Sequence, residues 1–394
     1  MVHRLRIALV HPFCWPEVRR GGERLLHDLA WYLAGAGHQV ELITGSWAGA
    51  SVTEEDGVVV RRHQLHDPPA LRRRRLGPTE SFGATTAAAL VRRRYDVVHS
   101  LTPSGALAAK LTGHRAIYTV LGHPSPEDLA LRPGTATLFR SAVRWADVTT
   151  ALSRSAADRV AQITRRRSSL RILPPGVRLD LFTPNLQPRV GPVRVLFASD
   201  ASEVYKGVHH ALAALAGLRR SYPEARLVLC GPGDPAWVVS GIKDSVDPSL
   251  ARTDPLAIEG LGSDGAALLD QATDQLADVG PDAMPDLYRS ATVTVLPSRD
   301  EAFGLVLAES LACGTPVACS SEAGMLEVAD RPEVGRTARF GDDDGLARAL
   351  TEAVELARQG PTPGHCADHA RRWGWAESVG PAYEALYREV AGQR

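Results

Sequence analysis

Residues 295–320 read VLPSRDEAFGLVLAESLACGTPVACS. An apolar run is followed by a polar loop, then by a segment of helical period from Gly304, and then by a second apolar run. This order predicts a strand–helix–strand unit whose strands are parallel and buried on both faces. Two glutamates stand in it, Glu301 in the loop and Glu309 in the helix. One carboxylate therefore lies at the mouth of the helix and the other about two turns further along it.

The same alternation extends through the chain on both sides of this unit. Further strands are expected in LRIALVH, QVELIT, VVVRRH, DVVHS, AIYTV, DVTTAL, VRVLFAS and RLVLCG, with helix-period segments such as ERLLHDLAWYLAGAG between them. A chain of 394 residues is too long for one ordinary core. We therefore predict an α/β protein made of two facing Rossmann-like domains with parallel sheets, and a ligand cleft between them.

Two segments interrupt this pattern. Residues 184–192 are rich in proline and have no period, so they are expected to form a linker. Residues 240–275 are rich in Asp, Ser and Gly and only weakly periodic, and are expected to form an inserted loop or lid.

Composition places the chain among soluble proteins. It is 44% hydrophobic and 23% charged, no apolar run reaches membrane-spanning length, and the N-terminus begins directly on an expected strand. The five cysteines are scattered and mostly lie in apolar runs, which predicts buried, reduced thiols. Together these features predict a cytoplasmic protein.

The zero net charge conceals an asymmetry between the halves. Residues 1–190 carry 27 Lys and Arg against 15 Asp and Glu, whereas the remainder carries 18 against 30. Arginine runs at 72–75, 92–94 and 165–167 supply much of the excess. One interpretation is that these arginines are simply solvated on the surface. The other is that they form a basic face that binds an anionic acceptor or the anionic inner surface of a membrane. Nucleic acid is not an expected partner, because no aromatic residues interleave the runs.

The helix that opens near Phe303 and Gly304 has the features of a phosphate site. A helix N-terminus presents unpaired amides and the positive end of the helix dipole, and glycine lets a ligand approach the backbone. Glu309 lies roughly 7–8 Å further along the axis, within reach of a ribose diol. Glu301, on the other side of the phosphates, would face whatever the diphosphate carries. A pair of glutamates at this spacing is also common by chance, so its surroundings must decide.

Five stretches in order carry a family resemblance: GGERLLHDLAWYLAGAGHQVELIT, ILPPGVRLDLFTP, YKGVHHALAAL, LCGPGD, and MPDLYRSATVTVLPS leading into the two glutamates. Together they resemble the family-4 glycosyltransferases, which have the two-domain GT-B fold. The resemblance implies an acceptor-binding domain over residues 1–184 and a donor-binding domain over 185–375. It also implies a C-terminal helix within 376–394 that returns to the first domain.

The resemblance also implies roles for individual residues. It gives Lys206 to the donor diphosphate, Glu301 to the donor sugar and Glu309 to the ribose. It also implies that the backbone of Gly22, Phe303, Gly304 and Leu305 contacts the donor. The acceptor-side loop that it implies contains Gly21, Gly22 and Glu23. An ammonium group at a helix start is suited to neutralising a leaving diphosphate, and it also fits an ordinary exposed lysine.

Two departures from the family pattern bear on the site. Asp200 stands where the family usually has an arginine, the second cation for the diphosphate, and Arg299 and Arg24 are candidates to replace it. The family's histidine after an N-terminal strand aligns strictly with Leu121, while His123 follows two residues later. His123 is therefore a candidate catalytic residue, or a surface residue of that loop.

The expected activity is transfer of a sugar from a nucleoside-diphosphate sugar to a hydroxyl acceptor, with retention of configuration and without a metal ion. No Asp-x-Asp follows a donor-half strand, and the acidic run 342–344 is interpreted as a helix cap. The expected partners are a nucleotide sugar and an unidentified hydroxyl acceptor. Two other classes remain open: a sugar-nucleotide epimerase or phosphorylase of the same architecture, and a non-catalytic binding protein.

Overall fold

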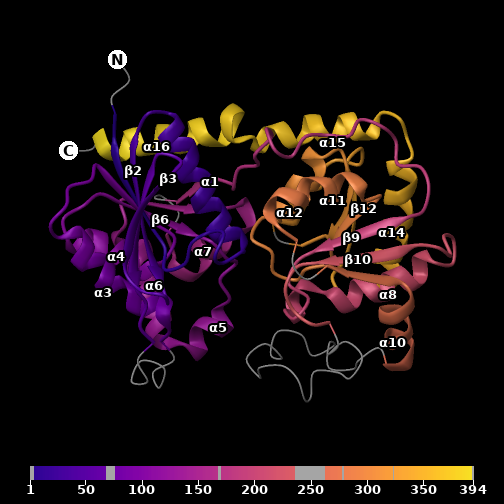
Figure 1. Cartoon of the computed structure of the whole chain (residues 1–394). Helices are drawn as coiled ribbons and strands as arrows, with labels where there is room; N and C mark the ends of the chain where they lie inside the picture. Colours follow the sequence, from indigo (N-terminus) through magenta and orange to yellow (C-terminus); the bar gives the residue numbers. More distant parts are fainter. Residues whose placement is uncertain are drawn as a thin grey trace. The chain divides into compact units, whose positions relative to one another are not determined.

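The computed structural model describes residues 4–67, 76–166, 170–235, 262–276, 279–322 and 324–392 (Figure 1). Its contacts divide the chain into two compact units, residues 1–176 with 373–394, and residues 177–372. The boundaries expected from the sequence, after 184 and after 375, fall slightly later. Trp375 belongs to the first unit because its indole packs on Gly176, where an added Cβ would lie 2.4 Å from indole atoms.

The first unit is built on an eight-stranded sheet in the order β3-β4-β2-β1-β5-β6-β7-β8. Its strands are β1 Arg6–Val10, β2 Gln39–Ser46, β3 Ser51–Glu55, β4 Val58–Gln64, β5 Val97–Ser100, β6 Ala116–Val120, β7 Val148–Ala151 and β8 Leu170–Ile172. Neighbouring strands are parallel except for β3, which pairs antiparallel with β4. The sequence did not predict β3 or β8. β3 reads SVTEE and is exposed throughout, so it has no buried apolar face to reveal it.

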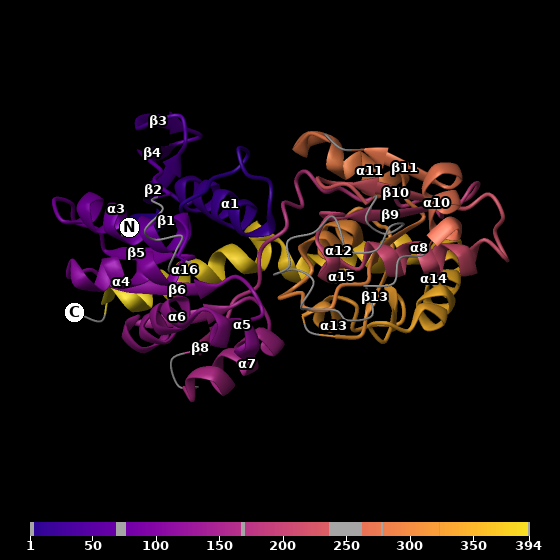
Figure 2. The same ribbon diagram turned by 90° about the horizontal axis from the view of Figure 1, so that it is seen from below.

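Helices cover both faces of this sheet (Figure 2). They are α1 Gly21–Gly35, α3 Pro78–Leu90, α4 Pro103–Leu111, α5 Pro126–Leu131, α6 Pro133–Trp145, α7 Arg154–Thr164 and α16 Gly380–Gly392. α3, α4 and α6 pack side by side, while the C-terminal helix α16 packs on α1 and β5. The hydroxyl of Tyr387 on α16 lies 2.6 Å from Nδ1 of buried His99 on β5. Helix α16 is therefore part of the core of the first unit.

The second unit contains a six-stranded, fully parallel sheet in the order β11-β10-β9-β12-β13-β14. Its strands are β9 Arg194–Ala198, β10 Arg226–Cys230, β11 Thr273–Leu276, β12 Val293–Leu296, β13 Val317–Ser320 and β14 Gly335–Ala338. The expected lid over 240–275 is wrong in its second part, where 262–271 form a helix and 273–276 form β11. β11 reads TDQL and has one buried residue, which explains why no apolar run signalled it. Residues 240–261 of the expected lid lie outside the described residues.

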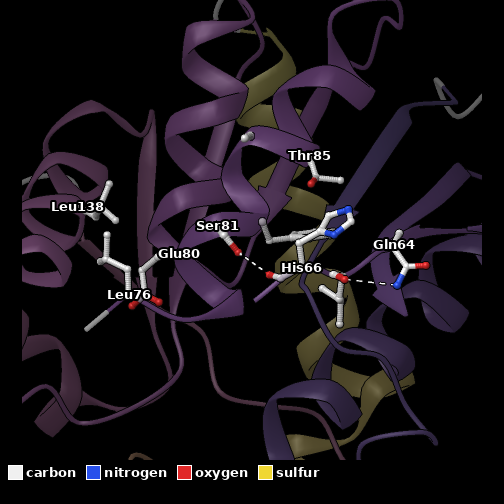
Figure 3. Close-up of a pocket in the computed structure, with 10 residues that line it drawn as sticks. Gln64, His66, Leu76, Glu80, Ser81, Thr85 and Leu138 are labelled. Carbon is white, nitrogen blue, oxygen red and sulfur yellow. Dashed lines mark hydrogen bonds between the residues drawn. The ribbon is translucent and has the colours of Figure 1, made fainter. Parts of the chain in front are cut away.

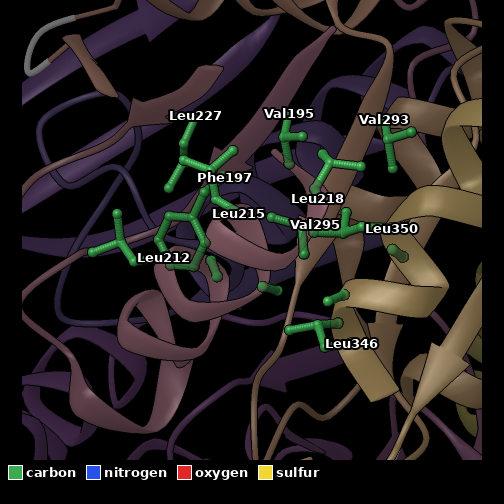
Figure 4. Close-up of a cluster of buried hydrophobic side chains, with 14 of the residues drawn as sticks. Val195, Phe197, Leu212, Leu215, Leu218, Leu227, Val293, Val295, Leu346 and Leu350 are labelled. Atoms are coloured by element: carbon green, nitrogen blue, oxygen red, sulfur yellow. The ribbon is translucent and has the colours of Figure 1, made fainter. Parts of the chain in front are cut away.

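The helices of the second unit are α8 Val208–Leu218, α10 Gly262–Gln271, α11 Met284–Ser290, α12 Leu305–Ala312, α13 Met325–Val328, α14 Asp343–Ala357 and α15 Thr362–Ala370. α8 packs against α14 and α10, whereas α12 packs against α11 and α15. Figure 4 shows side chains of β9, β10 and β12 meeting those of α8 and α14 in one buried cluster. Asp342 accepts a hydrogen bond from the backbone N–H of Gly345, so the prediction that the acidic run caps a helix is confirmed.

Sheet order fixes the place where a ligand would be expected in the second unit. β9 lies between β10 and β12, and the chain runs outward from β9 in one direction and returns at β12 to continue in the other. In such a sheet, the loops that follow these two strands diverge and leave a crevice at their carboxyl ends. Residues 199–207 follow β9, and residues 297–304 follow β12.

Two further expectations concern the whole chain. All five cysteines are free and buried, which confirms the prediction of buried thiols. In the part of the chain that the structure describes, no helix has the length and apolar character needed to cross a bilayer.

Candidate active site

Lys206 and Glu301, separated by 94 residues in sequence, form an ion pair in which Nζ lies 2.6 Å from Oε2. Lys206 ends a 3₁₀ turn, Val204–Lys206, and Gly207 follows with φ of +77°. A Cβ at Gly207 would lie 2.1 Å from the carbonyl oxygen of Pro297 in the loop after β12. Only glycine fits this position, because it combines a left-handed backbone with a backbone contact. The close approach brings Lys206 to the loop that carries Glu301.

The surroundings of Lys206 keep its ammonium group charged. Burial lowers its pKa, but attraction to Glu301, and then to Glu203 and Asp200, outweighs burial and raises the pKa above its ordinary value. The Lys206 and Glu301 side chains are only 17% and 20% exposed, so their attraction is screened less than that of a surface pair. A charged ammonium group is thus held in the loops that follow β9 and β12, where a ligand is expected.

The mouth of α12 has the form expected of a phosphate site. Gly304 precedes the helix with φ of +92°, and no side chain caps the helix N-terminus. Phe303 and Gly304 are buried and Leu305 is partly buried. The N–H of Gly324 donates to the carbonyl oxygen of Glu301 over 3.0 Å, which fixes the loop before the helix. The amides of the first turn therefore open beside the Lys206–Glu301 pair.

Glu309 lies further along α12 and is 8% exposed. The hydroxyl of Tyr288, on α11, donates a hydrogen bond of 3.0 Å to its Oε2. Sequence reasoning placed Glu309 but missed Tyr288, because nothing in MPDLYRS distinguishes a functional tyrosine from a core one. The predicted donor residues of the second unit thus share the loops and the helix that follow β9 and β12.

Asp200, which replaces the usual arginine, turns its carboxylate toward its own loop. Its Oδ1 accepts hydrogen bonds from the backbone N–H of Ser202 over 2.9 Å and from the Ser202 hydroxyl over 2.6 Å. Arg299 lies in the loop after β12, and its backbone N–H donates over 2.9 Å to the carbonyl oxygen of Tyr205, the residue before Lys206. The other candidate, Arg24, belongs to the first unit and pairs with Asp28 over 2.8 Å. Of the two arginines, Arg299 is the one placed beside Lys206.

The residues predicted for the acceptor side lie in the first unit, in the helix that follows β1 in the chain. Gly21, Gly22 and Glu23 form the first turn of α1, so the expectation that they lie in a loop is wrong. No side chain caps this helix either. Gly22 packs on Leu121, where an added Cβ would lie 2.6 Å from Cδ1. Glu23 is buried, with its Oε1 3.3 Å from Nη2 of Arg20.

His123 lies in the loop after β6, two residues beyond Leu121. Its Nε2 is 3.1 Å from the hydroxyl of Ser155 at the start of α7. Through Leu121 this loop contacts the first turn of α1. His123 thus lies in a loop that contacts the residues predicted for the acceptor side.

Comparison with known proteins assigns the chain to a family. Residues 19–181 match the model described as Glycosyltransferase Family 4, and residues 192–355 match the model described as Glycosyl transferases group 1. The chain belongs to the family-4 glycosyltransferases. It is 27% identical over 393 residues to the D-inositol 3-phosphate glycosyltransferase of Arthrobacter sp. strain FB24, covering 92% of this chain and 88% of the relative. It is 33% identical over 240 residues to the enzyme of that name from Thermobispora bispora, covering 56% of this chain and 52% of the relative.

Solved structures share the fold of this glycosyltransferase. Sucrose-phosphate synthase of Thermosynechococcus elongatus superposes with a TM-score of 0.75 at 20% identity, covering 99% of this chain and all of that one. HepE of Anabaena, in complex with UDP and glucose, gives a TM-score of 0.69 at 18% identity, covering 97% and 99% of the two chains. The predicted GT-B fold is confirmed.

A pocket of about 410 Å³ also lies in the first unit of the glycosyltransferase, between the end of β4 and the start of α3 (Figure 3). Its walls are largely apolar, and Glu80 is already engaged by the N–H of Gly77 and the hydroxyl of Thr135. The hydroxyl of Ser81 donates to the carbonyl oxygens of Pro78 and His66. None of the predicted site residues lines this pocket.

Across the described ranges of the glycosyltransferase, no three His, Cys, Asp or Glu side chains gather where they could hold a metal ion.

Proposed function

We propose that this glycosyltransferase moves a sugar from a nucleoside-diphosphate sugar to a hydroxyl acceptor with retention of configuration. The observation that carries the proposal is the Lys206–Glu301 ion pair at the uncapped N-terminus of α12. A cation and the backbone amides of a helix N-terminus stabilise the negative charge that develops on a leaving diphosphate, and they do so without a metal ion. The carboxylate beside them is suited to hydroxyl groups of the transferred sugar.

Each residue of the site then has one task. Lys206 and the amides of Phe303, Gly304 and Leu305 hold the diphosphate, Glu301 holds the sugar, and Glu309 holds the ribose diol. The bond between the anomeric carbon and the phosphate oxygen breaks, the acceptor oxygen bonds to that carbon on the same face, and the departing phosphate takes the acceptor proton. Glu301 is a poor nucleophile for a covalent alternative, because its ion pair with Lys206 stabilises the carboxylate.

The acceptor is proposed to be an anionic compound with a free hydroxyl group, bound by the first unit near Gly21, Gly22, Glu23 and His123. Residues 1–190 carry an excess of twelve positive charges, which attract anions. A relative that aligns over most of the chain is named for D-inositol 3-phosphate, a phosphorylated polyol. The same charge would also draw the enzyme to the anionic inner surface of the cytoplasmic membrane. Phosphorylated inositol and vesicles containing anionic lipid, each compared with its neutral counterpart, distinguish these sources.

An assay with candidate sugar nucleotides tests the proposed activity. UDP-glucose is the first donor to try, because HepE was solved with UDP and glucose. With an acceptor present we expect release of the free nucleoside diphosphate and formation of a glycoside of retained configuration, with equal rates in EDTA and in magnesium. Interconversion of the sugar nucleotide without release would indicate an epimerase, and binding without turnover a binding protein. Loss of transfer in EDTA that magnesium or manganese restores would contradict metal independence.

Arg299 is proposed to supply the second cation of the diphosphate site, in place of the arginine that the family usually has at the position of Asp200. Arg299→Gln is expected to weaken binding of the free nucleoside diphosphate by about tenfold, because a charge-assisted contact to phosphate is lost while the ion pair of Lys206 stays. Isothermal titration calorimetry measures the change. Arg336→Gln, which removes an arginine paired with Glu352 elsewhere in the second unit, is the matched control. Unchanged affinity in Arg299→Gln would show that Lys206 and the amides hold the diphosphate alone.

A further inference from the structure

We propose that Tyr288 is a positioning residue that aims Glu309 at the nucleotide ribose and so sets the preference of the site for a ribonucleotide. This inference rests on the proposed function, in which Glu309 binds the ribose diol. Tyr288 lies on α11, outside the strand–helix–strand unit that carries Glu309. Its contribution is therefore invisible in the spacing of the two glutamates.

The contact between the two side chains is direct and buried. The hydroxyl of Tyr288 donates to Oε2 of Glu309 over 3.0 Å, and Tyr288 is fully buried. Burial, together with the negative charge of Glu309, raises the pKa of the tyrosine well above its ordinary value. The phenol therefore keeps its proton and acts as the donor, while Glu309 acts as the acceptor.

The tyrosine is itself held by a chain of buried polar groups. The hydroxyl of Thr315 donates to the carbonyl oxygen of Tyr288 over 2.7 Å, and Nη2 of Arg189 donates to that hydroxyl over 3.0 Å. The hydroxyl of Ser310, next to Glu309 on α12, lies 3.0 Å from the carbonyl oxygen of Thr315. The helix that carries Tyr288 and the helix that carries Glu309 are thus tied to one residue, Thr315.

This arrangement prepares the carboxylate before a ligand arrives. A free glutamate side chain has several rotamers, and ordering them opposes binding. Tyr288 removes part of that cost by holding Oε2 in place. A carboxylate offers about four lone-pair positions, so the hydrogen bond from Tyr288 does not by itself prevent the carboxylate from accepting hydrogen bonds from the diol. A pre-aimed acceptor rejects a nucleotide without ribose hydroxyls more strongly than a mobile one does.

The test compares UDP, ADP and GDP with their 2′,3′-dideoxy forms, using the nucleotide that the wild-type enzyme binds most tightly. Ribose recognition is measured by the dissociation constant of the dideoxy form divided by that of the ribonucleotide. We expect Tyr288→Phe to lower this ratio by about tenfold through weaker binding of the ribonucleotide, with binding of the dideoxy form unchanged. The KM for the donor should rise while kcat stays within about twofold. A merely structural role would not separate the two nucleotides.

Two variants make the result interpretable. Tyr222→Phe, at a tyrosine that packs under Arg358 elsewhere in the second unit, controls for loss of a phenol and should leave the ratio unchanged. Glu309→Ala should lower the ratio, and adding Tyr288→Phe to it should have no further effect. A ratio that Glu309→Ala leaves at the wild-type value overturns the ribose role itself. If Glu309→Ala lowers the ratio and Tyr288→Phe does not, or weakens both nucleotides equally, the positioning role of Tyr288 is overturned.

Discussion

Lys206→Ala is expected to lower kcat by about 10²–10³ while the protein stays folded. The ammonium group lies beside the uncapped start of α12, where the proposed leaving diphosphate gains charge as its bond to the sugar breaks. A contact that strengthens as the transition state is reached affects turnover more than binding of the intact donor. Steady-state release of the nucleoside diphosphate, measured at saturating donor, gives the change in kcat.

Lys110→Ala is the matched control for this variant. Lys110 also forms a short, partly buried ion pair, with Oδ2 of Asp147 2.8 Å from its Nζ, but it lies on α4 of the first unit. Its removal should cost some stability and leave kcat within about twofold of the wild-type value. If Lys206→Ala retained wild-type turnover, the diphosphate would have to be neutralised by another group, with Arg299 the first to examine.

Most of the strands that the sequence revealed are buried on both faces. RIALV, VVHS and AIYTV form the middle of the first sheet, and each is almost completely buried and rich in apolar residues. The missed strands lie at or beside sheet edges and bury less. β14 reads GRTA and β11 reads TDQL, so neither carries a hydrophobic pattern that would separate it from a loop. Their pairing with β13 and β10 depends on the sheet, which a local pattern cannot show.

The site was predictable to the extent that it is local. The helix beginning after Gly304 and the two glutamates lie within one short segment, and their order along the helix follows from its rise. The ion pair between Lys206 and Glu301 joins the loop after β9 to the loop after β12. The contact of Tyr288 with Glu309 joins two helices. Such contacts depend on the order of strands in the sheet and on the close approach at Gly207, and neither is visible in residue spacing.

The position of Asp200 shows how a departure from a family pattern is accommodated. A carboxylate aimed at a diphosphate would oppose its binding by charge repulsion. Here the carboxylate accepts two hydrogen bonds from Ser202 instead, and so completes the turn after β9. The remaining effect of Asp200 on the site acts through Lys206, whose pKa it helps to raise. The loop after β9 thus keeps Lys206 charged, although it lacks the arginine that the family usually has at the position of Asp200.

Glu301→Gln is expected to reduce kcat by roughly 10² while affinity for the free nucleoside diphosphate stays within a few-fold of the wild-type value. The proposed partner of this carboxylate is the transferred sugar, which the free nucleoside diphosphate lacks. The ion pair also makes Glu301 a competitor of the phosphates for Lys206, so its removal does not weaken their binding. Calorimetry with the nucleoside diphosphate and kinetics with the full donor separate the two effects.

The pH profile of Glu301→Gln gives an independent check on the pair. Attraction to Glu301 is the largest influence that raises the pKa of Lys206, and burial opposes it. Without the glutamate the folded-state pKa of Lys206 falls, so the charged, active form is lost at a lower pH as the solution becomes alkaline. The residual activity of Glu301→Gln should therefore decline in a pH range where the wild-type rate is still flat. An alkaline limb identical in both enzymes, or an equal loss of nucleotide affinity in Glu301→Gln and Lys206→Ala, would show that the two side chains do not divide the donor between them as proposed.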